Sequence, residues 1–122
     1  MSSIGENVSR VDGPAKVTGA AQYTGDLEFQ RLTFVKVLRS VHPHARLVSV
    51  DASAAEAVSG VTAVLTRADL SPEHSYFGPV VKDQPIVALD RVRYVGEVVA
   101  AVAAEDPDAA EEAVDLIQVE YE

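Results

Sequence analysis

The first half of the chain contains two runs of largely apolar residues whose side chains would alternate between the two faces of a strand, which predicts two β-strands. Residues 32–39 carry β-branched and aromatic side chains on both faces, as expected of a strand covered on both sides. Residues 46–50 repeat the alternation, with Val48 and Val50 on one face. Because the polar stretch between the two runs is short, the strands are predicted to form a hairpin.

A short helix at about residues 54–59 is predicted to follow the second strand. Ser53 and Glu56 have the spacing of a capping box, in which the hydroxyl accepts from the Glu56 N–H and the carboxylate reaches back. Gly60 can end this helix in the left-handed conformation. The sequence therefore marks both ends of the helix.

The second half of the chain predicts one further helix and several short strands. Asp106 and Pro107 form a strong helix start, because Asp caps free N–H groups and Pro fits the first helical position. Apolar residues then recur at helical spacing as far as Ile117, which predicts a helix at about 107–117. The other expected elements are strands at 61–65, 86–89, 98–104 and 118–121, a helical turn at 66–69, a long loop at 71–85 and a turn at 90–93.

The order of these elements predicts an α+β fold in which two main helices pack on small mixed sheets. Both helices return the chain to strands, so a two-layer sandwich of α+β or α/β type is the natural solution. The small apolar residues at 98–104 are expected to form a strand buried on both faces. Residues 27–122 are assigned to this single domain, and residues 1–26, rich in Gly, Ser, Asp and Thr, to an extended, turn-rich arm.

Charge and composition restrict the classes of function. The 122 residues include 19 acidic side chains and 10 Lys or Arg, a formal net charge of −9, which argues against a nucleic-acid partner. The absence of cysteine removes thiolate metal sites, Fe–S ligation and a thiol nucleophile. No basic region followed by an apolar run resembles a secretory signal, and no apolar run approaches the length that crosses a bilayer, so a cytoplasmic location is expected.

The histidines are the candidate metal ligands. His42 and His44 flank Pro43 and offer two imidazoles to a cation, with Asp51 or His74 as a third ligand delivered by folding. The alternative is a proline-containing hairpin tip with solvated imidazoles. We favour this alternative, since short motifs match by chance, and predict that no stoichiometric metal is bound.

Three further features have a functional and a structural interpretation. Lys16 lies in a glycine-containing segment, but a phosphate-binding loop needs Lys directly after its last Gly. We therefore favour the interpretation that these glycines only allow turns in an extended arm. Glu97 precedes a buried strand and could place a carboxylate in a site, but it has no partner that would make it a base, so a solvated or capping acid is favoured, with a contact to another domain as the intermediate option. Tyr76 and Phe77 either anchor a neighbouring domain, which we favour slightly, or fold back over a sheet edge.

Several segments, in the expected order, resemble a known module. They are Arg10–Gly19 (RVDGPAKVTG), Tyr23–Asp26 (YTGD), Val37–Ser40 with His44–Arg46, Gly60–Thr66 (GVTAVLT), Val92–Glu97 (VRYVGE) and Glu111–Glu122 (EEAVDLIQVEYE). From about Val8 to Glu122 the chain resembles the α/β-hammerhead domain that begins the molybdenum-binding large subunit of the xanthine dehydrogenase and aldehyde oxidase family. This family of molybdenum hydroxylases includes aerobic carbon monoxide dehydrogenases.

The resemblance implies an oxidoreductase whose parent enzyme contains molybdopterin with molybdenum, Fe–S clusters and often FAD. The loops that contact the cofactor, and the catalytic Glu, belong to later domains of the family. No position of this chain matches them, so the sequence assigns no catalytic, cofactor-binding or metal residue. The partners implied are the downstream molybdopterin-binding domains and the Fe–S and FAD subunits, with neither nucleic acid nor membrane.

The first hypothesis is therefore a structural and interface domain of such a large subunit, inactive alone. It is either a dissected domain or a natural short product, since the family continues past Glu122. The alternative is a stand-alone, non-catalytic binding or assembly module with the same fold. A third and weaker interpretation is a small acidic metal-binding protein that uses His42, His44 and His74. Self-association of the isolated domain, through surface that its neighbours would cover, stays open.

Overall fold

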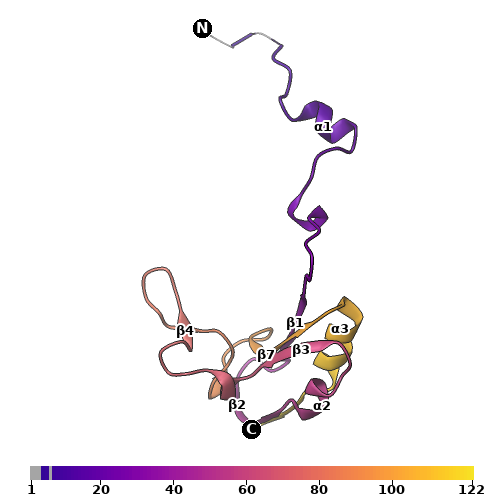
Figure 1. The fold of residues 1–122 in the computed structure, drawn as a ribbon. Helices are drawn as coiled ribbons and strands as arrows, with labels where there is room; N and C mark the ends of the chain where they lie inside the picture. The colour runs from indigo at the N-terminus through magenta and orange to yellow at the C-terminus, as the bar shows by residue number, and fades with distance from the viewer. Residues whose placement is uncertain (1–3, 6) are drawn as a thin grey trace. The chain divides into compact units, whose positions relative to one another are not determined.

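The computed structural model describes residues 4, 5 and 7–122, which form two compact units, residues 1–30 and 31–122. The first unit contains the helix α1 (Gly13–Val17) and the 3-10 turn η1 (Thr24–Asp26) (Figure 1). None of its described residues is buried. This unit has local structure but no core of its own.

Helix α1 lies where the sequence predicted only turns and extended chain, so that prediction was wrong for residues 13–17. Pro14 fits the first turn of a helix, where its missing N–H costs no hydrogen bond. Asp12 pairs with Lys16 at 2.6 Å and with the Arg10 guanidinium at 2.5 Å. The Arg10 guanidinium, and then the Lys16 ammonium, lower the pKa of the Asp12 carboxyl. These local ion pairs favour the helix over an extended arm.

The second unit is an α+β domain built on small sheets, as the sequence predicted. Its helical elements are α2 (Ser53–Glu56), η2 (Arg67–Asp69) and α3 (Pro107–Asp115). The strands form three sheets. The first has the spatial order β1 (Phe34–Arg39), β7 (Val98–Ala104), β3 (Val61–Leu65), and the second β6 (Arg91–Val92), β2 (Ala45–Asp51), β8 (Gln118–Tyr121). The third is the pair β4 (Tyr76–Phe77) and β5 (Gln84–Pro85). Throughout the described residues these strand pairs are antiparallel, so the expected mixture of strand directions is absent.

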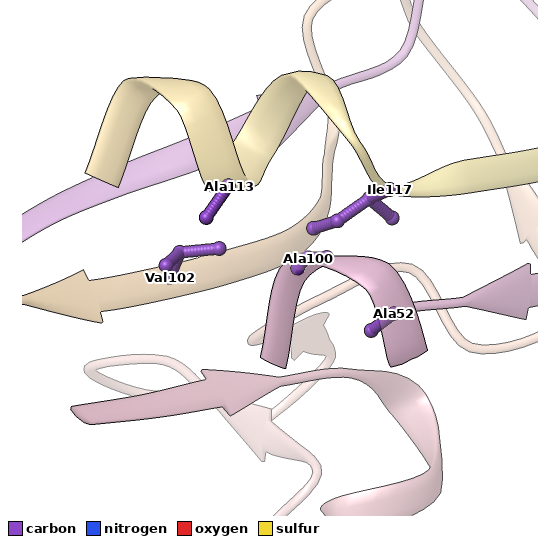
Figure 2. Packing of buried hydrophobic residues seen from close by; sticks show 6 residues of the cluster. Ala52, Ala100, Val102, Ala113 and Ile117 are labelled. Atoms are coloured by element: carbon purple, nitrogen blue, oxygen red, sulfur yellow. The ribbon is translucent and has the colours of Figure 1, made fainter. Parts of the chain in front are cut away.

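Strand β7 is the centre of the domain, because it pairs with β1 on one side and β3 on the other. Helix α3 packs on this sheet, and Figure 2 shows Ala113 of α3 and Ile117, just after the helix, on the side that faces Val102 of β7. Ala100 and Ala52 belong to the same buried cluster. Small side chains at this layer let the helix approach the sheet closely.

The ends of α3 and η2 follow the sequence signals. The Asp106 carboxylate accepts from the N–H groups of Asp108 (3.0 Å) and Ala109 (2.8 Å), as predicted for the start of α3. At η2, the Asp69 carboxylate accepts from the Thr66 N–H at 2.7 Å, a bond that lowers the pKa of Asp69. Both helical starts are confirmed.

The capping box predicted at Ser53 was wrong. The helix begins at Ser53 itself, with Ala52 as the flanking residue, and the Asp51 carboxylate accepts from the Ser53 N–H at 3.0 Å. That bond lowers the pKa of Asp51. The helix is also shorter than the predicted 54–59, since it ends at Glu56. Gly60 has φ +89° in the turn before β3, so its left-handed conformation is confirmed.

The hairpin predicted between residues 32–39 and 46–50 was wrong, because the two strands belong to different sheets. β1 pairs with β7, whereas β2 pairs with β6 and β8. The short polar stretch between them is a crossover rather than a hairpin tip. Short sequence separation favours hairpins, but β1 pairs along its whole length with the apolar run of β7 instead of with β2.

Strand β1 was expected to be covered on both faces, and this was wrong: most of its residues are exposed, Val35 by 62%. Strand β7 was also expected to be buried on both faces. Between residues 100 and 104, however, α3 covers one face only, and buried and half-buried residues alternate there. The bounds predicted for β3, β7 and β8 agree with the structure. The pattern therefore located the strands but overestimated their cover.

The strand predicted at 86–89 is absent, and the predicted turn at 90–93 contains β6. Val87 and Ala88 are nevertheless buried, and the Ala88 N–H donates to the Val98 carbonyl at 2.8 Å. These residues are apolar because they are buried, although they form no β-ladder. No helix in the described part of the chain is long and apolar enough to span a membrane.

Arg67 ties η2 to two other segments of the domain. Its Nη1 donates to the carbonyls of Leu47 and Leu89, both at 2.9 Å, and its Nη2 donates to the Val48 carbonyl at 2.7 Å. Three backbone carbonyls are thereby satisfied by one guanidinium, whose planar fork suits several acceptors at once. The Arg67 side chain therefore connects the segment that follows β3, in one sheet, to β2, in another.

Replacement of Arg67 by Lys is expected to lower the free energy of unfolding by about 2 kcal/mol, since an ammonium cannot reach all three carbonyls. Urea denaturation measures this change. Arg91→Lys is the matched control, because Arg91 makes only an exposed pair with Asp90, and it should change stability by less than about 0.5 kcal/mol. Equal effects of the two variants would contradict the role given to Arg67.

Replacement of Ala113 by Leu is expected to destabilise the domain by about 1–3 kcal/mol, because the fully buried site has no room for a larger side chain. Thermal and urea unfolding measure the loss. Glu112→Leu introduces the same side chain on the exposed face of α3 and should cost less than about 0.5 kcal/mol. A neutral Ala113→Leu variant would show that the helix and sheet are not closely packed.

Candidate functional site

The crossover between β1 and β2 is held against a turn at residues 94–97. The Ser40 N–H donates to the Glu97 carbonyl at 2.9 Å, and the Gly96 N–H donates to the Ser40 carbonyl at 2.8 Å. The Arg39 guanidinium also donates to the Gly96 carbonyl at 2.8 Å. Gly96 has φ +91°, a left-handed conformation that side chains disfavour. Two segments that both appear in the family resemblance thus form one polar site.

Glu97 is the buried acid of this site, with only 4% of its surface exposed. Its carboxylate accepts a short hydrogen bond from the Arg93 N–H, and the Arg93 guanidinium lies 3.7 Å away. Of the interpretations proposed for Glu97, the solvated acid is wrong and the capping acid is confirmed. The carboxylate closes the turn onto its own backbone, so its hydrogen-bonding capacity is used within the fold.

The outer side of the same turn is charged at its base and apolar at its tip. Asp90 pairs with Arg91 at 2.8 Å and with Arg93 at 3.0 Å, and the Arg91 side chain is the main cause of the lowered Asp90 pKa. Tyr94 and Val95 at the tip are 53% and 63% exposed. An apolar tip on a rigid polar base is suited to contact with another protein surface.

The three histidines are not brought together. Among the described residues, no group of three His, Cys, Asp or Glu side chains is placed to hold a metal ion. The ring of His42 lies 4.7 Å from that of Tyr121, and Nδ1 of His74 lies 2.9 Å from the Ser71 hydroxyl. The geometry gives no basis for the metal site at His42, His44 and His74.

The remaining candidates are also placed by the structure. Lys16 lies on α1 and pairs with Asp12, so no phosphate cradle surrounds its ammonium. Tyr76 and Phe77 form β4, and they are 43% and 48% exposed instead of folded over a sheet edge. Their exposure agrees with an anchoring role, which stays a prediction.

The residues of this chain do not fit a molybdopterin or an Fe–S cluster. The sequence has no cysteine to ligate iron. A hollow of about 250 Å³ beside β3 is lined by one charged side chain, Glu56, with Thr62 and apolar neighbours, which is no cradle for a polar pterin and its phosphate. In the described part of the chain, every buried side-chain nitrogen or oxygen has a hydrogen-bond partner.

Sequence reasoning missed two residues that organise the site and its surroundings, Ser40 and Arg67. Ser40 is 2% exposed, and its hydroxyl accepts from the His42 N–H at 3.0 Å. The partners of its backbone lie in the distant 94–97 turn, so no local signal marked it. For Arg67 the only signal was a cation next to the capping Thr66, which does not reveal its three carbonyl partners.

Replacement of Glu97 by Ala is expected to lower the free energy of unfolding by about 1–3 kcal/mol, since the Arg93 N–H would lose its acceptor in a buried place. Glu97→Gln retains an acceptor oxygen and should cost less. Urea denaturation gives the stabilities, and hydrogen exchange at the Arg93 amide reports the bond itself. An unchanged Arg93 exchange rate in Glu97→Ala would contradict this assignment.

Absence of bound metal stays a prediction of the sequence. Elemental analysis of the purified chain should find well under one transition ion per chain, because the described residues bring no third ligand to His42 and His44. His42→Ala with His44→Ala is the control, and it should leave any trace metal unchanged. One ion per chain that disappears in this double variant would restore the metal hypothesis.

Known proteins match this chain in sequence and in structure. The family model for the aldehyde oxidase and xanthine dehydrogenase a/b hammerhead domain matches residues 18–122. A probable xanthine dehydrogenase component from Bacillus subtilis is 53% identical over 92% of this chain and 15% of its own length. The large molybdopterin subunit of nicotinate dehydrogenase from Eubacterium barkeri is 43% identical over 98% of this chain and 28% of its own.

Solved structures agree. Quinoline 2-oxidoreductase from Pseudomonas putida 86 matches with a TM-score of 0.88 and 38% identity over 99% of this chain and 16% of that one. A Cu,Mo carbon monoxide dehydrogenase also gives a TM-score of 0.88, with 37% identity over 94% and 15% of the two chains. The chain thus spans less than a third of the length of these relatives. It belongs to the aldehyde oxidase and xanthine dehydrogenase family, of which it forms the α/β-hammerhead domain.

Proposed function

We propose that this chain serves as a structural and interface domain of a molybdenum-dependent oxidoreductase and performs no chemistry alone. The observation that carries the proposal is the share of length: the chain is matched almost entirely, yet it spans 15–28% of its curated relatives. The buried polar groups support it, since Glu97, Ser40 and Arg67 all bond within the fold.

The partners that we propose are the molybdopterin-binding domains of the same enzyme, followed by its Fe–S and FAD subunits. The name of the Eubacterium barkeri relative includes molybdopterin, which supports the first of these partners. The cofactors would be held by those domains, since this chain has no group suited to them. Residues 27–122 would act as the hammerhead domain and residues 1–26 as its arm. A cytoplasmic location remains a prediction, which cell fractionation would test.

Exposed apolar side chains on separate parts of the chain support an interface role. In the second unit, Tyr94 and Val95 form the apolar tip of the 94–97 turn, and Tyr76 and Phe77 are half exposed on β4. In the first unit, every large apolar residue that the structure describes is exposed: Ile4, Val8, Val11, Val17, Tyr23, Leu27 and Phe29. A unit in which none of the described residues is buried gains stability by packing on another protein surface.

The test is purification of the full chain, with an affinity tag, from the cells that naturally produce it. A polypeptide that contains molybdopterin should co-purify in equal amount, whereas the chain made alone should turn over neither purines nor aldehydes. A tagged chain recovered without such a polypeptide would favour the stand-alone assembly module. Turnover by the chain alone would contradict the proposal outright.

A further inference from the structure

The sheet β1–β7–β3 has one face covered by helices and one open face. On β1, the Lys36 ammonium lies 3.0 Å from the Glu111 carboxylate of α3, and Leu38 packs on the core beneath the helices. Side chains alternate along a strand, so Val35 faces the other way. The helices therefore cover only one face of this sheet, and Figure 1 shows α3 beside it.

The open sheet face is apolar across all three strands. Five apolar residues of this face, Val35, Ala63, Leu65, Ala101 and Ala103, line a hollow together with the buried Val102 of β7. Of these five, Val35 and Ala63 are exposed and the other three are half-buried. The hollow of about 210 Å³ contains no charged or hydrogen-bonding side chain. An apolar side chain of a partner would fit this hollow without leaving a polar group unpaired.

The opposite surface of the domain has the reverse character. The outer side of α3 and the residues before it carry exposed carboxylates, namely Glu105, Asp106, Asp108, Glu111, Glu112 and Asp115. Charged surface of this kind is stable in water, whereas a continuous apolar sheet face gains free energy when it is covered. The domain thus has a solvent side at α3 and a docking side at the open sheet face.

The character of the chain and its relatives indicates what covers this face. A second copy would bring another net charge of −9 to the contact, and like charges oppose association. In the matched relatives, by contrast, 72–85% of the polypeptide lies outside the segment that this chain spans. Most of each of those subunits is therefore available within the same polypeptide to cover this face.

We propose that the open sheet face docks an apolar surface of the molybdopterin-binding part of the same enzyme, with one apolar side chain of that surface seated in the hollow. This rests on the proposed function and assigns the contact to one face of one sheet. Packing a second layer on β1–β7–β3 would also bury β7 on both faces, as the composition of this strand favours. Helix α3 remains in contact with solvent.

Cysteine reporters test the proposal, because the chain has no cysteine of its own. Val35→Cys and Ala63→Cys each place a thiol on the open sheet face, and Glu112→Cys is the control on the solvent side of α3. Each variant is labelled with a maleimide, both as the free chain and in the enzyme purified from its source, and the label is quantified on this chain by mass spectrometry. Assembly should slow labelling at Val35→Cys and Ala63→Cys at least about tenfold and leave Glu112→Cys unchanged.

The outcomes distinguish this inference from the proposed function on which it rests. Co-purification with equal labelling at all three positions overturns the docking face but leaves the domain assignment intact. Failure to co-purify with a molybdopterin-containing polypeptide overturns both. Protection of Val35→Cys in the free chain that increases with concentration makes a second copy the occupant, which also overturns the proposal. Unfolding curves for the three variants verify that each one is folded.

Discussion

Close packing of small side chains around β7 is the constraint on which the domain depends. Ala100 and Ala104 of β7 and Ala110 and Ala113 of α3 are fully buried, so the helix lies directly on the strand. Strand β7 also holds β1 and β3 in one sheet. Alanine contributes little apolar area per residue, so stability here comes from close approach and from the backbone ladders. Larger side chains at this layer would push α3 away from both neighbouring strands.

Polar side chains connect this layer to the rest of the domain. Ser40 joins the end of β1 to the turn that precedes β7, and Arg67 joins the segment after β3 to β2. Glu97 closes that turn from inside. Because these groups complete the hydrogen bonds of crossovers and turns, they serve the fold. The hydrogen bonds within the domain therefore account for the burial of these polar residues.

Local signals in the sequence predicted individual elements well, but not their pairing. The bounds of β3, β7 and β8 and the caps at Asp106 and Thr66 follow from residues within a few positions of each element. The hairpin failed because β1 prefers the apolar β7, far along the chain, over the nearby β2. Cover was overestimated for β1 because an apolar face signals burial, whereas in the structure one face of this strand is open.

The candidate site was predictable only in its outline. The strand pattern placed His42 and His44 on a hairpin tip, whereas the structure places them in a crossover between two sheets. The burial of Glu97 and the role of Ser40 depend on contacts between residues 39–42 and 93–97, which no local pattern contains. Long-range backbone pairing is thus the information that the sequence pattern lacked.

Native-state hydrogen exchange on the free chain tests the central role of β7 most directly. The amides of residues 100–104 should exchange only through global unfolding, with an opening free energy equal to that from urea denaturation. The amides of β4 and β5 should exchange through smaller, local openings. Exchange of the β7 amides at a lower free energy than those of β2 and β8 would contradict the account, since the domain would then not be built around β7.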